Sequence, residues 1–136
     1  MSLGIIPVFL PELKTTKFNF DFDGSTTLDF AEELDELAGE LGVASLADFS
    51  DCREAPEGYE GAPWELDEVL GPWTDWFAAT AGEETWTRLH AHLKDDPESL
   101  SDPDAVPYLL EELSEFIRVL DAAVKEGAQF RLSVVS

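Results

Sequence analysis

Oxygen-bearing side chains alternate along the segment NFDFDG, in the order typical of a calcium-binding loop. Asn19, Asp21 and Asp23 take the first, third and fifth places of such a loop, and Gly24 takes the sixth, where the backbone must bend sharply. The twelfth place, which requires a bidentate glutamate, is Phe30. No apolar periodicity for an entering helix precedes the segment. We therefore interpret these oxygens as the solvent face of a strand and expect no metal site.

The two histidines, His90 and His92, could bind one metal ion if they lay on a strand, because a His-x-His pair then points both rings to the same side. On the helix that the surrounding residues predict, their side chains point about 200° apart. We expect His90 to be a packed, hydrogen-bonded residue and His92 to lie at the surface. A small hydrolase or transferase that uses either histidine with an acidic partner is one functional alternative.

Cys52 is the single cysteine, so the chain cannot form an internal disulfide. Its neighbours Asp51 and Glu54 disfavour the thiolate more than Arg53 favours it, which argues against a reactive thiol. The sequence contains no glycine-rich phosphate loop, nucleophile elbow or zinc-type spacing. We therefore expect no cofactor and favour a non-enzymatic role.

Aromatic residues concentrate between Tyr59 and Phe77, a segment that also contains Trp64, Trp73 and Trp76. Aromatic side chains dominate binding hot spots, and acidic groups around them would attract a cation to their faces. The alternative is that these rings complete the core, since Trp is usually well buried. We predict that these five residues form a partner-binding surface.

Acidic residues greatly outnumber basic ones, and 8 Lys and Arg against 30 Asp and Glu give a net charge of 8 − 30 = −22. Such a surface repels nucleic-acid phosphates and anionic membranes but attracts a basic protein. Acidic doublets on a helix diverge by about 100°, so they are interpreted as solvated faces: Glu32-Glu33, Glu83-Glu84 and Glu111-Glu112. The acidity is also consistent with a role in solubility alone, or with mimicry of a nucleic acid.

The elements that must position these residues follow from hydrophobic periodicity. Strands are predicted at residues 4–10, where Pro7 requires an edge position or a bulge, at residues 17–22, where phenylalanine alternates with polar side chains, and at residues 128–135. Helices are predicted at residues 27–41, 82–94 and 104–126.

Local end signals support these helices. Gly42 and Gly127 supply left-handed stops, and three hydroxyl residues can cap the first helix: Ser25, Thr26 and Thr27. Ser45 can cap a short turn, residues 50–63 are predicted to be a loop, and two short helical turns are predicted over residues 64–77.

Strands at both ends of the chain with helices between them predict a single α+β domain over residues 1–136. The first and last strands should be neighbours in a small sheet packed against two or three helices on one face. No apolar run approaches the roughly 20 residues that a transmembrane helix needs, and the first residues lack the features of a signal peptide. A soluble, cytoplasmic protein is expected.

The segments WFAATAGEETWTRLHAHLKDDPE and LLEELSEFIRVLDAAVKEGAQFRLSV resemble the C-terminal half of small acidic bacterial α+β domains with no assigned activity. The shared features are a tryptophan-aromatic pair, a glycine, a helix, a long helix and a closing strand, and a weaker similarity extends to ELDELAGELGVASLADF. The resemblance implies a bacterial, cytoplasmic setting and carries over no catalytic residue. The favoured function is a non-enzymatic interaction domain, of the immunity or regulatory type, that occludes a basic partner.

Overall fold

The first and last strands of the chain pair with each other, as the sequence predicts. The computed structural model of the protein describes residues 4–19, 24–50, 58 and 75–135. Strand β1 (Gly4–Leu10) runs antiparallel to β3 (Gln129–Val135), and the two-residue strand β2 (Phe77–Ala78) pairs antiparallel with the other side of β3. The strand order is therefore β1-β3-β2. Pro7 lies on an edge strand, where its missing N–H is tolerated.

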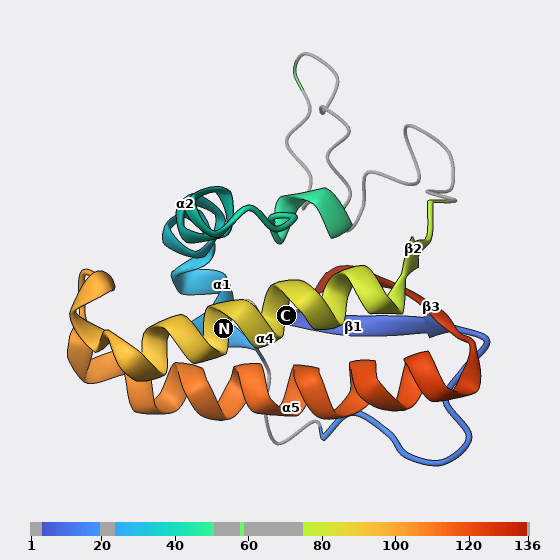
Figure 1. Cartoon of the computed structure of the whole chain (residues 1–136). Coiled ribbons are helices and arrows are strands. Elements are labelled where there is room, and N and C mark those ends of the chain that lie inside the picture. Colours follow the sequence, from blue (N-terminus) through green and yellow to red (C-terminus); the bar gives the residue numbers. More distant parts are fainter. Residues whose placement is uncertain (1–3, 20–23, 51–57, 59–74, 136) are drawn as a thin grey trace.

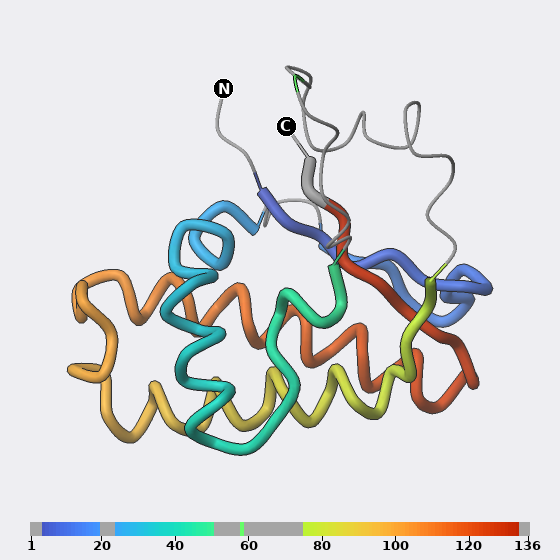
Figure 2. The backbone as a smooth tube through the Cα atoms, turned by 90° about the horizontal axis from the view of Figure 1, so that it is seen from above, coloured from blue at the N-terminus to red at the C-terminus, as the bar shows by residue number. Residues whose placement is uncertain are grey.

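Two long helices pack against this sheet (Figure 1). Helices α4 (Ala79–Asp95) and α5 (Val106–Glu126) lie antiparallel and side by side, joined by a connector that contains two short 3-10 turns. Figure 2 shows the shorter helix α2 (Ala31–Leu41) crossing α4. The predicted α+β class is confirmed, and in the part of the chain that the structure describes no helix is long and apolar enough to span a bilayer.

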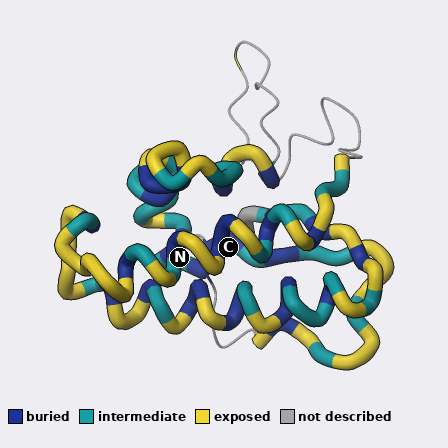
Figure 3. Tube along the Cα trace, in the orientation of Figure 1, coloured by how far each residue is buried: buried dark blue, intermediate teal, exposed yellow. Residues whose placement is uncertain are grey.

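The inner faces of these helices form an apolar core with an aromatic centre (Figure 3). Trp86, Leu89 and Leu93 of α4 are fully buried, as their helical spacing predicts. The Trp86 ring stacks on Phe116 of α5 with centroids 5.2 Å apart and meets Phe130 of β3 edge-on at 6.2 Å. The largest side chains of three elements therefore meet at one point, which fixes α4 and α5 against the sheet.

Helix ends agree with the sequence where glycine sets them. Gly42 and Gly127 end α2 and α5 in the left-handed conformation, with φ of 75° and 72°. Ser45 precedes the short 3-10 turn η1 (Ala47–Phe49), whose N-cap residue is Leu46, and the Ser45 Oγ accepts the Asp48 N–H at 3.2 Å. Helix α4 begins three residues earlier than predicted because β2 leads directly into it.

The predicted helix over residues 27–41 is two helices. Phe30, with φ −106° and ψ 16°, separates α1 (Ser25–Asp29) from α2. The N-cap residue of α1 is Gly24, so none of the three hydroxyl residues that the sequence offers as caps occupies the capping position. Instead, the backbone N–H groups at the start of α1 donate to the carboxylate of Glu112 on α5.

Gly24, which precedes α1, has no room for a side chain. Its φ is 72°, and a Cβ at this position would lie 1.8 Å from the backbone oxygen of Ile5. Only glycine combines this backbone conformation with so close an approach to β1. The glycine that the sequence suggested for a calcium loop therefore brings the chain against an edge strand.

The predicted strand over residues 17–22 is wrong for residues 17–19, which make no strand pairing, and residues 20–22 lie outside the described residues. The alternation of side chains is still visible, since Phe18 is buried and Asn19 is exposed. Phe18 packs on Phe116 with ring centroids 5.3 Å apart. The Asn19 N–H and the Lys17 carbonyl form hydrogen bonds with side chains of α5, in place of the bonds to a neighbouring strand that a sheet would provide.

Candidate functional site

Exposed carboxylates gather at the end of the molecule where α4 turns into α5. This acidic end comprises Glu32, Glu36 and Glu40 of α2, Asp95 of α4, and Asp96, Glu98, Asp102 and Asp104 of the connector. The two parts are held together because Glu33 accepts the backbone N–H of Ser101 at 2.9 Å and its hydroxyl at 2.8 Å. The fold thus joins two acidic segments that are more than sixty residues apart.

Most of the described cations lie elsewhere. Five of the seven lie in or beside the second half of α5 and the sheet: Lys14, Lys17, Arg118, Lys125 and Arg131. Arg88 and Lys94 of α4 are nearer to the acidic end, and Arg88 donates to the Leu41 carbonyl at 3.2 Å. That bond places a cation at the C-terminus of α2, where the helix dipole favours one. The acidic end therefore keeps a strong local excess of negative charge.

This arrangement can attract and hold cationic groups. At physiological salt the field of exposed charges decays over about 8 Å, so clustered carboxylates act together only at short range. Glu32, Glu36 and Glu40 rise by about 6 Å from one to the next along α2, so a partner with several cationic side chains can contact more than one of them.

The predicted aromatic surface is described at only two of its five residues. Phe77 is half-buried, pairs with Phe130 in the sheet, and meets the Phe49 ring edge-on at 5.6 Å. Trp76 is half-buried, and the guanidinium carbon of Arg131 lies 4.3 Å from its ring centroid. The chain's own cation thus occupies the position predicted for a partner's cation.

The remaining three residues of that surface, Tyr59, Trp64 and Trp73, lie outside the described residues, as does Cys52. The predicted helical turn at Trp76 and Phe77 is wrong, because Phe77 begins a strand.

His90 lies between α4 and α5. It is half-buried, and its Nε2 is 3.0 Å from Oγ of Ser114, so the two helices are linked by a hydrogen bond. Burial, together with the positive charge of Lys94, lowers the pKa of His90. In a neutral imidazole whose Nε2 carries no proton, this nitrogen accepts a hydrogen bond from the Ser114 hydroxyl. His92 is half-buried rather than at the surface.

A serine beside a histidine is also the beginning of a nucleophilic site, but further parts are needed. Catalysis requires a group that orients the imidazole and backbone donors that receive the oxyanion. Within the residues that the structure describes, no carboxylate is hydrogen-bonded to His90, and the N–H groups around Ser114 are in the interior of α5. In the same part of the chain, no group of three or more His, Cys, Asp or Glu could hold a metal ion. The geometry is that of a link between helices.

Comparisons of the chain with protein-family models, with curated proteins and with solved structures found no match. Function must therefore be inferred from the geometry and charge of the chain itself.

Sequence reasoning missed a polar row on α5. Glu112, interpreted as part of a solvated doublet, is 7% exposed, and Glu115 is 8% exposed. Glu112 accepts the Thr27 N–H and hydroxyl, both at 2.8 Å, and the Thr26 N–H at 3.3 Å. The sequence carries a signal for Glu112, which lies about 60° around the helix from Leu109 at the edge of the apolar stripe, but none for Glu115, which lies on the far side of that stripe.

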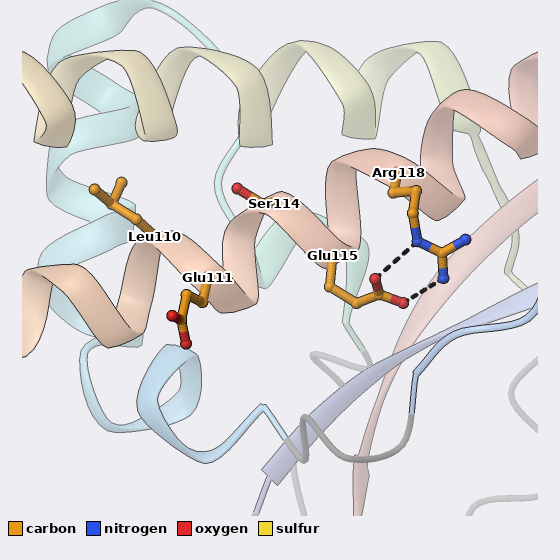
Figure 4. A pocket seen from close by; sticks show the side chains of 5 residues that line it. All are labelled: Leu110, Glu111, Ser114, Glu115 and Arg118. Carbon is orange, nitrogen blue, oxygen red and sulfur yellow. Dashed lines mark hydrogen bonds and ion pairs between the residues drawn. The ribbon is translucent and has the colours of Figure 1, made fainter.

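Glu115 forms a bidentate pair with Arg118, at 2.8 Å and 2.6 Å (Figure 4). Burial alone would raise the pKa of Glu115, but hydrogen bonds from Arg118 and from the Asn19 N–H outweigh it and hold that pKa below its ordinary value. The pair forms part of the lining of a shallow hollow of about 520 Å³ on α5. Both of its charged groups are already engaged with the chain, which makes this a structural pair rather than an open binding site.

Proposed function

We propose that this chain is a non-enzymatic interaction protein that binds a basic protein through its acidic end, as an immunity-type or regulatory protein would. The observation that carries the proposal is the local excess of negative charge on α2 and the connector, where eight exposed carboxylates lie near only two of the described cations, Arg88 and Lys94. Complementary charge increases the rate of association and suppresses wrong partners. A bacterial, cytoplasmic setting is part of the proposal and rests on the resemblance of the sequence.

A macromolecular partner fits this surface better than a small cation does. The carboxylates are spread over a helix and a connector, and they do not converge on a point as metal ligands do. A protein surface with several Lys or Arg side chains can contact both segments at once. The bond between Glu33 and Ser101 holds those segments in a fixed relation, so binding requires little reordering.

The aromatic segment from Tyr59 to Phe77 is a second candidate contact surface in the same proposal. Its described part lies at the start of α4, at the opposite end of that helix from the acidic end. The two surfaces can therefore be separated by mutation.

The experiment begins with capture of a partner by chemical crosslinking and mass spectrometry, followed by measurement of its dissociation constant. The triple variant Glu32→Gln, Glu36→Gln, Glu40→Gln removes three charges from the acidic end. We expect roughly tenfold weaker binding at physiological salt and a smaller dependence on salt concentration.

A matched control removes the same charge from exposed positions outside the acidic end, with Glu12→Gln, Glu84→Gln and Glu111→Gln. Equal weakening by both triple variants would show that net charge alone is responsible and would contradict the assignment of the acidic end. If only Trp73→Ala with Trp76→Ala abolishes binding, the contact surface is the aromatic segment. A captured partner that is not basic contradicts the proposal altogether.

A further inference from the structure

Residues Lys14–Asn19 lie along α5 without belonging to a helix or strand, and we call them the strap. One end of the strap is held by a single carboxylate. Glu126 accepts the Lys14 N–H at 2.8 Å, the Thr15 N–H at 3.3 Å and the Thr15 hydroxyl at 2.6 Å. These bonds lie at exposed positions, and they lower the pKa of Glu126.

The middle and far end of the strap are held by the ion pair on α5. Arg118 donates to the Thr16 hydroxyl oxygen, and also to the Lys17 carbonyl at 2.7 Å. Glu115 accepts the Asn19 N–H at 2.7 Å. Because Glu115 also fixes the Arg118 guanidinium, the two contacts depend on the same pair.

The strap forms one wall of a groove beside an edge strand. The groove has a volume of about 360 Å³ and is lined on one side by residues 6–9 of β1 and on the other by Thr16, Lys17 and Phe18. Phe18 is the only buried side chain of the strap and packs on Phe116. Edge strands expose unpaired backbone groups, which proteins commonly protect by covering them.

We propose that the strap is a gate at this groove, a wall that detaches from α5 as one local unit while the helices and the sheet remain folded. The hydrogen bonds of Lys14 and Thr15 to Glu126, and that of the Lys17 carbonyl to Arg118, lie at exposed positions. Segments held by solvent-exposed hydrogen bonds open at a lower free energy than packed helices do. The closed strap forms the wall of the groove opposite β1, and the carboxylates of α5 set how often that wall opens.

Limited proteolysis with a lysine-specific protease tests the gate, because Lys14 and Lys17 are exposed lysines within the strap. The protease would cut the peptide bond that contains the Lys17 carbonyl. Arg118 donates a hydrogen bond to this carbonyl and must release it before cleavage. Lys94 in the last turn of α4 is the internal reference for opening of the helices. We expect cleavage at the two strap lysines at least about tenfold faster than at Lys94, with helical circular dichroism retained.

Substitutions on α5 show which carboxylates hold the strap. Glu115→Gln and Glu126→Gln should each speed cleavage in the strap by about threefold to tenfold, with no change at Lys94. Glu111→Gln, an exposed position on the same helix, is the matched control and should change neither rate.

Two results would overturn the gate: strap lysines cut no faster than Lys94 in the unmodified chain, or Glu115→Gln and Glu126→Gln accelerating both regions equally. If Glu115→Gln fails to fold, Glu126→Gln and hydrogen exchange at the Thr15 and Asn19 amides decide the question. Amides that exchange only with global unfolding refute the gate, and earlier exchange supports it.

Discussion

Replacement of Glu112 by alanine tests whether a buried carboxylate of α5 holds the N-terminus of α1. Glu112 accepts three hydrogen bonds, two of them from Thr27, whose exposed fraction is 0%. Glu112→Ala leaves a buried N–H and a buried hydroxyl without their acceptor. It also removes the negative charge from the positive end of a helix.

The magnitude follows from these groups. A buried donor left without a partner costs about 1–3 kcal/mol, and relaxation or an entering water recovers part of this. We therefore expect Glu112→Ala to lower the free energy of unfolding by about 2–4 kcal/mol. Glu112→Gln keeps an oxygen acceptor near Thr27 and should cost about 1 kcal/mol. A domain of this size has about 5–15 kcal/mol of stability, so both variants should remain folded in buffer.

Urea denaturation followed by circular dichroism measures the difference, with the slope of the transition checked for each variant. Glu111→Ala, the exposed neighbour on α5, is the control and should stay within about 0.5 kcal/mol of the unmodified chain. Thr27→Val combined with Glu112→Ala should be less destabilising than the sum of the two single changes, because both remove the same contact. If Glu112→Ala costs no more than Glu111→Ala, the carboxylate does not hold α1.

Four further variants have expected outcomes. Gly24→Ala should lower the free energy of unfolding, measured by urea denaturation, by more than about 2 kcal/mol, because the new Cβ would lie 1.8 Å from the Ile5 oxygen. Gly42 has a similar φ but open space around it, so Gly42→Ala should lower the same free energy by only about 1 kcal/mol. The folded pKa of Glu115 is lowered, so its stabilisation is complete above the unfolded pKa of about 4.3 and is lost as the pH falls through the folded pKa. Below about pH 5, the melting temperature of the Glu115→Gln variant should therefore fall less steeply than that of the unmodified chain. Burial and a neighbouring carboxylate raise the pKa of Glu83, so Glu83→Gln should raise the melting temperature at pH 7 and have no effect at pH 3.

The elements that sequence reasoning predicted correctly are those with purely local causes. A short apolar run bounded by glycine and proline defines β1, and a left-handed glycine ends each of two helices. The edge position of Pro7 follows in the same way, from a missing N–H. In each case the residue that determines the structure lies within the element or directly at its end.

The errors concern backbone groups whose partners are distant in sequence. The alternation around Phe18 correctly predicts which side is buried, but it cannot show that Glu115, 96 residues from Asn19, accepts the backbone N–H. The break at Phe30 has a similar origin, since the start of α1 is fixed by Glu112 from another helix. Such contacts depend on tertiary packing, which local periodicity does not encode.

The acidic end could be predicted only in part, because it too depends on contacts between residues distant in sequence. The acid excess is evident in the sequence, but only the packing of α2 beside the connector joins the two acidic segments, through a bond between residues 68 positions apart. Trp76 is the converse case. Its ability to bind a cation was predicted from its chemistry, but its partnership with Arg131 depends on the position of β2 beside β3.

The carboxylates of this chain fall into two groups that should respond oppositely to neutralisation. Glu112 and Glu115 accept backbone N–H groups and stabilise the fold. Glu32, Glu36 and Glu40 are exposed at successive i, i+4 positions of α2, where like charges repel each other and destabilise a helix. Their triple replacement by glutamine should therefore leave the melting temperature unchanged or slightly raised while it weakens binding of the basic partner. A fall in melting temperature would mean that these carboxylates support the fold, and loss of binding could then no longer be assigned to the acidic end.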